Sequence, residues 1–243
     1  MLEVRIDRKA FGANQTIIHD TAFAIEAGEV VALLGPSGAG KTTLLRILLG
    51  LEQSFEGRVR SRHRRVGVMF QEPRLLPWLT VTENLRLVVT GAMPPPDTES
   101  LLASVQLQDA GSLYPAQLSL GMARRVALVR ALAVSPDFVV LDEPFASVDA
   151  QLGAILADAI TRYACATGAT VILATHDLAP VLNRVSRFLI LAGCPTTLCA
   201  DRPASSTSQA SLLRDFPFLR SESNKDQHLL SSPKPRYCHQ NNS

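Results

Sequence analysis

The chain has 243 residues, of which 47% are hydrophobic, so it is long and apolar enough to bury a sizeable core and is not a disordered protein. Its 24 Lys and Arg residues and 22 Asp and Glu residues give a net charge of +2, which is too balanced for a dedicated nucleic-acid-binding protein. It contains no secretory signal and no apolar run of the roughly 18 residues that span a bilayer, so we expect a cytosolic chain. Its four cysteines lack metal-type spacing, and we expect free thiols.

Strands of an antiparallel layer are the first elements expected. Residues 2–7 and 23–26 alternate apolar with polar side chains, as half-buried strands do. Phe11 lies between them. An aromatic ring ahead of a phosphate-binding loop can stack on adenine, because stacking tolerates any base, or can belong to the core. The residues alone leave both interpretations open.

A glycine-rich loop follows the apolar run 30–34 and precedes a helical pattern at 44–49. Its residues are Gly35, Pro36, Ser37, Gly38, Ala39, Gly40, Lys41, Thr42 and Thr43, which fit the G-x-x-x-x-G-K-[ST] pattern. In such a loop the backbone N–H groups and the helix N-terminus bind phosphate oxygens. Lys41 would bridge the β- and γ-phosphates, and Thr42 would bind Mg²⁺. The segment therefore predicts nucleotide binding.

The segment 58–79 combines a basic stretch, a buried strand and an apolar loop. The five arginines and one histidine of residues 58–65 favour a solvated hairpin face over a binding patch. After the strand at 66–70, the amide oxygen of Gln71 can reach Mg²⁺ and the attacking water. Residues 73–79 carry large apolar side chains and the only tryptophan. We expect a partner to cover that loop.

A helical block is expected from about residue 80 to residue 133, inserted between core strands. Thr80 and Glu83 form a capping-box pattern at its start. Ser119 is placed to cap the helix at 123–133. A capped helix N-terminus can bind phosphate or can simply be a capped helix, and this stretch alone favours the second interpretation.

Two adjacent carboxylates end the buried strand at 138–142. Asp142 would hold Mg²⁺, and Glu143 suits a base that polarises the attacking water. His176 follows the apolar strand 170–175, where it would face the ligand crevice and hydrogen-bond the γ-phosphate or the water. Asp149 lies on the turn into the next helix.

The last strand expected is at 188–191. The domain organisation predicted is one domain over residues 1–204, with a core of 1–79 and 134–204. Residues 205–243 are polar and predict a flexible tail, with one or two helical turns near 211–216.

The assembled motifs resemble the ATP-binding subunit of ABC transporters over roughly residues 2–200. They are GPSGAGKTT, Gln71, LSLGM at 118–122, FVVLDEP at 138–144, SVD at 147–149 and His176. The segment 70–81 is further similar to the nitrate, sulfonate and taurine importer branch. The resemblance implies an α/β fold: a P-loop NTPase (RecA-like) core with a mainly parallel sheet, an N-terminal antiparallel layer and an inserted helical subdomain.

The resemblance also implies a head-to-tail homodimer that holds two ATP molecules with Mg²⁺. Ser119 and Gly121 would donate to the γ-phosphate across the interface, Asp149 would communicate between the sites, and Phe11 would stack on adenine. Glu143, His176 and Lys41 would be the catalytic residues, with Thr42, Gln71 and Asp142 around the metal.

The expected partners are a membrane permease, received by the loop at residues 73–81, and an external solute-binding protein. The chain would lie at the cytoplasmic face of the membrane and import a small anionic solute.

Two residues depart from the family pattern. Leu120 stands where the family usually has glycine, and Met122 where it often has glutamine. A side chain at Leu120 can obstruct the close approach of backbone to phosphate, so we expect ATP to bind and the dimer to close less readily. The alternatives are an ABC ATPase of another transporter branch and a low-turnover degenerate subunit. A soluble ABC-type ATPase acting on DNA or ribosomes would need a coiled-coil insertion or a second cassette, and the sequence has neither.

Overall fold

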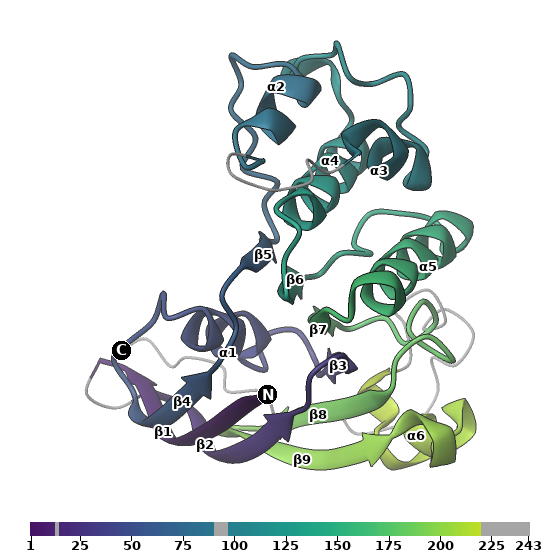
Figure 1. Ribbon diagram of the computed structural model, residues 1–243. Coiled ribbons are helices and arrows are strands. Elements are labelled where there is room, and N and C mark those ends of the chain that lie inside the picture. The colour runs from purple at the N-terminus through teal and green to yellow at the C-terminus, as the bar shows by residue number, and fades with distance from the viewer. Residues whose placement is uncertain (13–14, 90–96, 220–243) are drawn as a thin grey trace, which may run out of the picture.

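One sheet forms the centre of the molecule in the computed structural model, which describes residues 1–12, 15–89 and 97–219. Within these residues nine strands pair in the order β4-β1-β2-β9-β8-β3-β7-β6-β5 (Figure 1). The strands are β1 (Leu2–Phe11), β2 (Gln15–Ile25), β3 (Val30–Leu34), β4 (Glu56–Ser61), β5 (Val66–Met69), β6 (Phe138–Asp142), β7 (Thr170–Thr175), β8 (Arg187–Gly193) and β9 (Thr196–Pro203).

Five neighbouring strands, β8, β3, β7, β6 and β5, are parallel. Every residue of β3, β6 and β7 is buried, because helices cover both faces of this part of the sheet. The carboxyl ends of these strands meet at one edge, where ligands bind in open α/β sheets. The parallel core expected from the apolar runs is confirmed.

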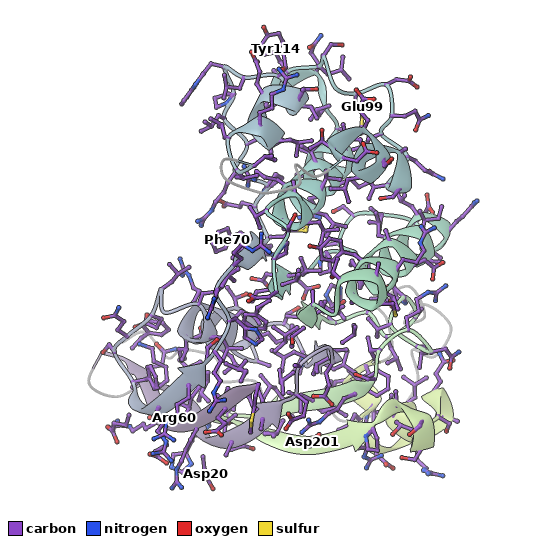
Figure 2. All side chains as sticks on the ribbon, viewed as in Figure 1. Asp20, Arg60, Phe70, Glu99, Tyr114 and Asp201 are labelled. Carbon is purple, nitrogen blue, oxygen red and sulfur yellow. The ribbon has the colours of Figure 1, made fainter. Side chains whose placement is uncertain are left out.

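The antiparallel layer predicted at the N-terminus is also confirmed. Strand β1 pairs with β2 on one side and with β4 on the other. Arg60 of β4 and Asp20 of β2 are exposed at this end of the molecule (Figure 2). The predicted hairpin between β4 and β5 is wrong, because β4 pairs with β1 whereas β5 pairs with β6.

The helices are α1 (Lys41–Leu48), α2 (Val81–Arg86), α3 (Thr98–Ser104), α4 (Leu120–Ala133), α5 (Ala150–Thr167) and α6 (Gln209–Asp215), with 3-10 turns at Pro115–Gln117, Ala204–Ser206 and Pro217–Leu219. In Figure 1, α2 and α3 lie beyond the β5 end of the sheet, and α4 connects them to it. Thr80 caps α2 in a capping box, and Asp97 caps α3.

Two features differ from the expectation for the C-terminal part. Strand β9, which pairs antiparallel with β8, was not predicted, because its residues are largely polar and only partly buried. The tail expected from residue 205 begins with folded chain: α6 packs Leu212 into the core, and Leu219 is buried as well. Residues 220–243 of the predicted tail lie outside the described residues.

Candidate functional site

The phosphate-binding loop lies between β3 and α1, at the carboxyl edge of the parallel strands. Gly38 and Gly40 have φ values of 80° and 73°, a left-handed conformation that glycine adopts without strain, and Gly40 caps α1. A Cβ atom on Gly35 would lie 2.8 Å from the carbonyl oxygen of Leu191, so the loop packs against β8 without room for a side chain. The sequence therefore fixes a tight turn at the N-terminus of α1.

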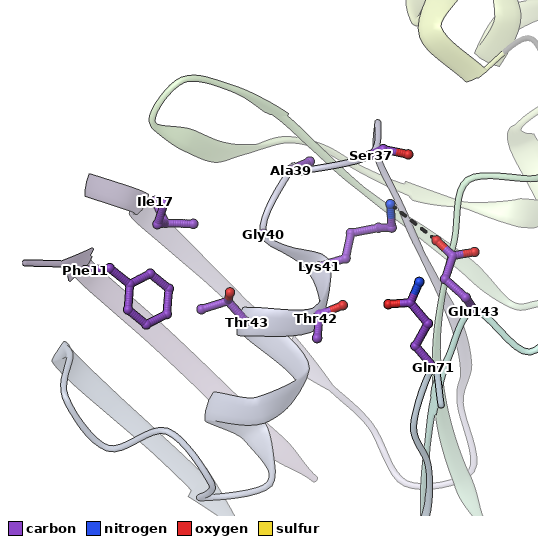
Figure 3. A pocket seen from close by; sticks show the side chains of 11 residues that line it. Phe11, Ile17, Ser37, Ala39, Gly40, Lys41, Thr42, Thr43, Gln71 and Glu143 are labelled. Carbon is purple, nitrogen blue, oxygen red and sulfur yellow. Dashed lines mark ion pairs between the residues drawn. The ribbon is translucent and has the colours of Figure 1, made fainter. Parts of the chain in front are cut away.

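The Lys41 side chain is buried inside this turn, with 7% of its surface exposed. Its Nζ atom donates to the carbonyl oxygens of Gly35, at 2.8 Å, and Pro36, at 3.2 Å. It also forms an ion pair with Glu143 at 3.5 Å (Figure 3). Burial lowers the pKa of Lys41, although the charge of Glu143 opposes this shift. The loop thus holds a cation where a phosphate would need one.

Thr42 and Asp142 form a pair of oxygen donors between α1 and the end of β6. The Thr42 hydroxyl donates to Oδ2 of Asp142 at 2.8 Å. The other carboxylate oxygen, Oδ1, is buried and has no partner among the described residues. Burial raises the pKa of Asp142, and the hydrogen bond from Thr42 opposes this shift. A buried, unpaired carboxylate oxygen beside a hydroxyl fits Mg²⁺, which prefers hard oxygen ligands.

Glu143 and His176 are brought together from the ends of β6 and β7. The Nδ1 atom of His176 lies 2.9 Å from Oε2 of Glu143. Glu143 has a φ of 53°, and its N–H donates to the carbonyl oxygen of Ala174, which holds the backbone in this uncommon conformation. Burial acts to raise the pKa of Glu143, but the His176 hydrogen bond and the Lys41 charge outweigh it and lower the pKa. The same hydrogen bond raises the pKa of His176.

A pocket of about 310 Å³ opens in front of these groups. Figure 3 shows Phe11 and Ile17 at one end and Gln71 and Glu143 at the other. The lining residues are Phe11, Ile17, Ser37, Gly38, Ala39, Gly40, Lys41, Thr42, Thr43, Gln71 and Glu143. All of these except Ile17 were predicted from the sequence. Their roles toward a ligand remain predictions.

Ile17 reaches the pocket through an irregularity in the sheet. Lys9 pairs with Ile18, and the next residue, Ala10, pairs with Thr16, so Ile17 is the extra residue of a bulge. A Cβ atom on Gly40 would lie 3.1 Å from Ile17 Cγ2, so the two segments are in close contact. Ile17 stands beside the buried Ile18, and nothing in the sequence indicates which of the two isoleucines would face the pocket.

Ser119, Gly121 and Asp149, which were predicted to act across a dimer interface, do not line this pocket. Ser119 caps α4 by accepting from Met122 N–H, and Asp149 caps α5 by accepting from Leu152 N–H. The two caps are linked within the chain, because Arg124 of α4 donates to the Ala146 carbonyl oxygen and to the Ser147 hydroxyl. The phosphate contacts predicted for Ser119 and Gly121 across a dimer interface remain predictions.

The loop at residues 73–79 is held by a buried asparagine of α2. Asn84 accepts from Leu76 N–H at 2.8 Å and donates to the carbonyl oxygens of Leu76, Leu79 and Thr80. Arg130 of α4 donates to the carbonyl oxygens of Pro73 and Arg74. Trp78 nevertheless keeps 68% of its surface exposed. The loop is thus firmly anchored while presenting an indole to its surroundings.

A model of the ABC transporter family matches residues 18–146, which include the phosphate-binding loop, α4 and the strand that ends in Asp142. The chain belongs to the ABC transporter family. This cassette is 41% identical over 202 residues to an aliphatic sulfonates import ATP-binding protein, SsuB 2, of Pseudomonas syringae pv. tomato, covering 83% of this chain and 87% of that protein. It is 43% identical over 208 residues to a protein of the same name from Burkholderia cenocepacia, covering 80% and 75% of the two chains.

Solved ABC cassettes share the fold. A dimeric post-hydrolysis state of the ATP-binding cassette MJ0796, bound to ADP and Pi, has a TM-score of 0.74 at 26% identity, covering 84% of this chain and 99% of that one. Another dimeric structure of MJ0796 gives a TM-score of 0.75 with the same identity and coverage. The predicted P-loop NTPase-type fold and the resemblance to ABC ATP-binding subunits are confirmed.

No helix within residues 1–12, 15–89 and 97–219 combines the length and apolar character needed to cross a bilayer.

Proposed function

We propose that this cassette binds and hydrolyses ATP and thereby powers an importer for aliphatic sulfonates. The observation that supports ATP hydrolysis is that Lys41 pairs with Glu143 and that Asp142 pairs with Thr42, beside a pocket lined by the phosphate-binding loop. The substrate class is supported by the 41% and 43% identical relatives, which are named as aliphatic sulfonate import proteins. Nitrate and taurine importers are the alternatives within the same branch.

The phosphates of ATP would bind to the N–H groups of the loop and the N-terminus of α1. On phosphate binding the Lys41 ammonium would move from the Gly35 and Pro36 carbonyl oxygens to the phosphate oxygens. The Glu143 carboxylate is ionised, because its pKa is lowered, so it can accept a hydrogen bond from the attacking water and orient it. His176, which contacts Glu143, would hold that carboxylate and stabilise the charge that develops on the γ-phosphate.

Mg²⁺ fits the oxygen donors at the same edge. Thr42 and Asp142 would hold it, with Gln71 reaching from the end of β5. When bound, the cation neutralises charge on the β- and γ-phosphates during transfer.

The active form we propose is a head-to-tail dimer. The dimeric MJ0796 cassettes support this assembly. Ser119 and Gly121 of one subunit would then reach the γ-phosphate held by the other, and Asp149 would lie between the two sites. A membrane permease would bind to the exposed Trp78 and its anchored loop. The permease would hold the cassette at the cytoplasmic face of the membrane. An external solute-binding protein would deliver the solute to the permease.

Uptake measurements test the substrate class. Cells in which the gene is deleted would lose ATP-dependent uptake of a labelled alkanesulfonate and keep uptake of labelled nitrate. Expression of the wild-type protein would restore sulfonate uptake, and expression of the Glu143→Gln variant would not. Loss of nitrate or taurine uptake with intact alkanesulfonate uptake would reject the proposed substrate.

A further inference from the structure

Two lysines are buried among the described residues, and only one of them, Lys41, belongs to the phosphate-binding loop. The other is Lys9 of β1, with 2% of its surface exposed. Burying an ammonium group is costly unless it is paired and hydrogen-bonded. The groups that surround the Lys9 ammonium therefore indicate its role.

Three groups surround the Lys9 ammonium. It donates to the Ser54 carbonyl oxygen at 2.8 Å and forms an ion pair with Glu52 at 3.0 Å. Its third neighbour is the ring of Phe11, whose centroid lies 4.3 Å from Nζ, within the range of a cation–π interaction. Glu52 and Ser54 follow the end of α1, so Lys9 joins the segment behind the phosphate-binding helix to the aromatic ring at the pocket.

The backbone of β1 is shaped so that Lys9 and Phe11 share this side. Leu2, Val4 and Ile6 are buried at even positions, and the buried residue then shifts to Lys9. The shift arises at a bulge. Ile6 pairs with Gly57 and Arg8 pairs with the adjacent Glu56, so Asp7 is the extra residue.

Gly57 itself has a φ of 133°, and a Cβ atom there would lie 2.2 Å from the Arg5 carbonyl oxygen. Only glycine fits this position. The bulge moves Lys9 and, two residues on, Phe11 to a common face.

We propose that Lys9 is a positioning residue for the nucleobase: its ammonium fixes one face of the Phe11 ring and leaves the other face for the base of the nucleotide. The proposal rests on the proposed function, in which Phe11 stacks on adenine. Phe11 lines the pocket and is 47% exposed, so an unsupported ring would be free to rotate between several orientations. Fixing the ring before binding lowers the entropy lost on stacking.

The test compares two ligands that differ in the base. ATP and inorganic tripolyphosphate, each with Mg²⁺, are titrated against the wild-type chain and the variants Lys9→Met, Lys9→Gln and Phe11→Leu. We expect both Lys9 variants to weaken ATP binding by about two- to tenfold and to leave tripolyphosphate binding unchanged. In the double variant Lys9→Gln/Phe11→Leu, the loss should equal that of Phe11→Leu alone, because the ammonium acts through the ring.

Two controls separate positioning from a structural role. Lys9→Gln keeps an N–H donor for the Ser54 carbonyl oxygen, so a folded neutral variant is available if Lys9→Met unfolds. Glu52→Gln removes the ion pair but keeps the cation beside the ring, so it should lower the midpoint of thermal unfolding and leave the ratio of the two affinities unchanged.

Three outcomes would overturn the proposal. A Lys9→Gln variant that binds ATP as the wild type does would show that the ammonium is not needed. Equal weakening of ATP and tripolyphosphate would assign Lys9 to the structure behind α1 instead. If neither the Lys9 variants nor Phe11→Leu change ATP binding, the stacking role of Phe11 in the proposed function fails as well. If Phe11→Leu weakens ATP binding strongly and the Lys9 variants do not, only the role of Lys9 is rejected.

Discussion

The imidazole Nδ1 atom of His176 lies 2.9 Å from a carboxylate oxygen of Glu143, which itself lies 3.5 Å from the ammonium of Lys41. Side chains that directly follow β7 and β6 are thereby joined to the lysine of the phosphate-binding loop. The hydrogen bond holds the Glu143 carboxylate ionised and in one orientation, because it lowers the pKa of Glu143 and raises that of His176. The arrangement is suited to orienting a water molecule.

Replacing His176 with alanine should lower the kcat for ATP hydrolysis by roughly 10²-fold, with a change in KM of less than about threefold. The His176 side chain is half exposed, so its removal should leave folding intact. The lower kcat would come from a less well oriented Glu143 and from weaker charge stabilisation. Phosphate release measured over a range of ATP concentrations separates the two constants. A variant with wild-type kcat would remove His176 from the catalytic residues.

Glu143→Gln should bind ATP as tightly as the wild type and turn over at least about 10²-fold more slowly, because an amide cannot accept the proton of the attacking water. We expect this variant to accumulate as an ATP-bound dimer on gel filtration with ATP and Mg²⁺. The control variant Asp158→Asn changes a carboxylate of α5 that pairs with Arg184 and does not line the pocket, so it should behave like the wild type. A monomeric Glu143→Gln protein in saturating ATP would count against the dimer.

Leu120 is the first residue of α4, directly after the Ser119 cap, and 55% of its surface is exposed. In the proposed dimer, a phosphate held by the other subunit would approach the backbone at this helix N-terminus, and the Leu120 side chain would obstruct it. We expect Leu120→Gly to strengthen ATP-dependent dimerisation and to raise the hydrolysis rate severalfold. Sedimentation with ATP and a phosphate-release assay would measure both effects.

The matched control for Leu120 is Leu51→Gly, which removes a similarly exposed leucine just after α1. If Leu120→Gly changes neither dimerisation nor rate, the side chain is no obstacle. A wild-type rate no higher than that of Lys41→Ala would favour a low-turnover subunit.

Asn84→Ala should lower the free energy of unfolding by about 2–3 kcal/mol, because it removes the acceptor of Leu76 N–H and the donor of the Leu79 carbonyl oxygen, whereas the Leu76 and Thr80 carbonyl oxygens keep backbone partners. Urea unfolding followed by circular dichroism measures the loss. Asn84→Asp keeps an acceptor for Leu76 N–H but has no donor for the carbonyl oxygens, so it should also destabilise the fold. Full stability of the alanine variant would mean that the loop does not depend on this side chain.

The parallel core and the loop motif were predictable because the buried strands are continuous apolar runs and because glycine, lysine and threonine must stand at fixed spacing around a phosphate. The pairing of Glu143 with His176 was not predicted. Each residue directly follows a different strand, and the pairing of β6 with β7 in the sheet brings them together.

The remaining misses have a common physical cause, which is that they depend on how a segment pairs or packs with other parts of the fold. Strand β9 is polar and gains its structure from β8. The positions of Ile17 and Lys9 follow from bulges, which shift the alternation of side chains without a local sequence signal. The folded part of residues 205–219 depends on Leu212 and Leu219, which reach the core from a stretch whose first residues are polar.

The most direct measurement of the central claim is equilibrium dialysis of labelled ATP with Mg²⁺ against the wild-type chain and a folded Lys41→Ala variant. Lys41 is the cation that the loop keeps buried beside Gly35 and Glu143. We predict saturable binding of about one ATP per wild-type chain and a loss of affinity of at least about tenfold in the variant. No uptake by the folded wild type, or equal uptake by the two proteins, would contradict the assignment of this pocket to ATP.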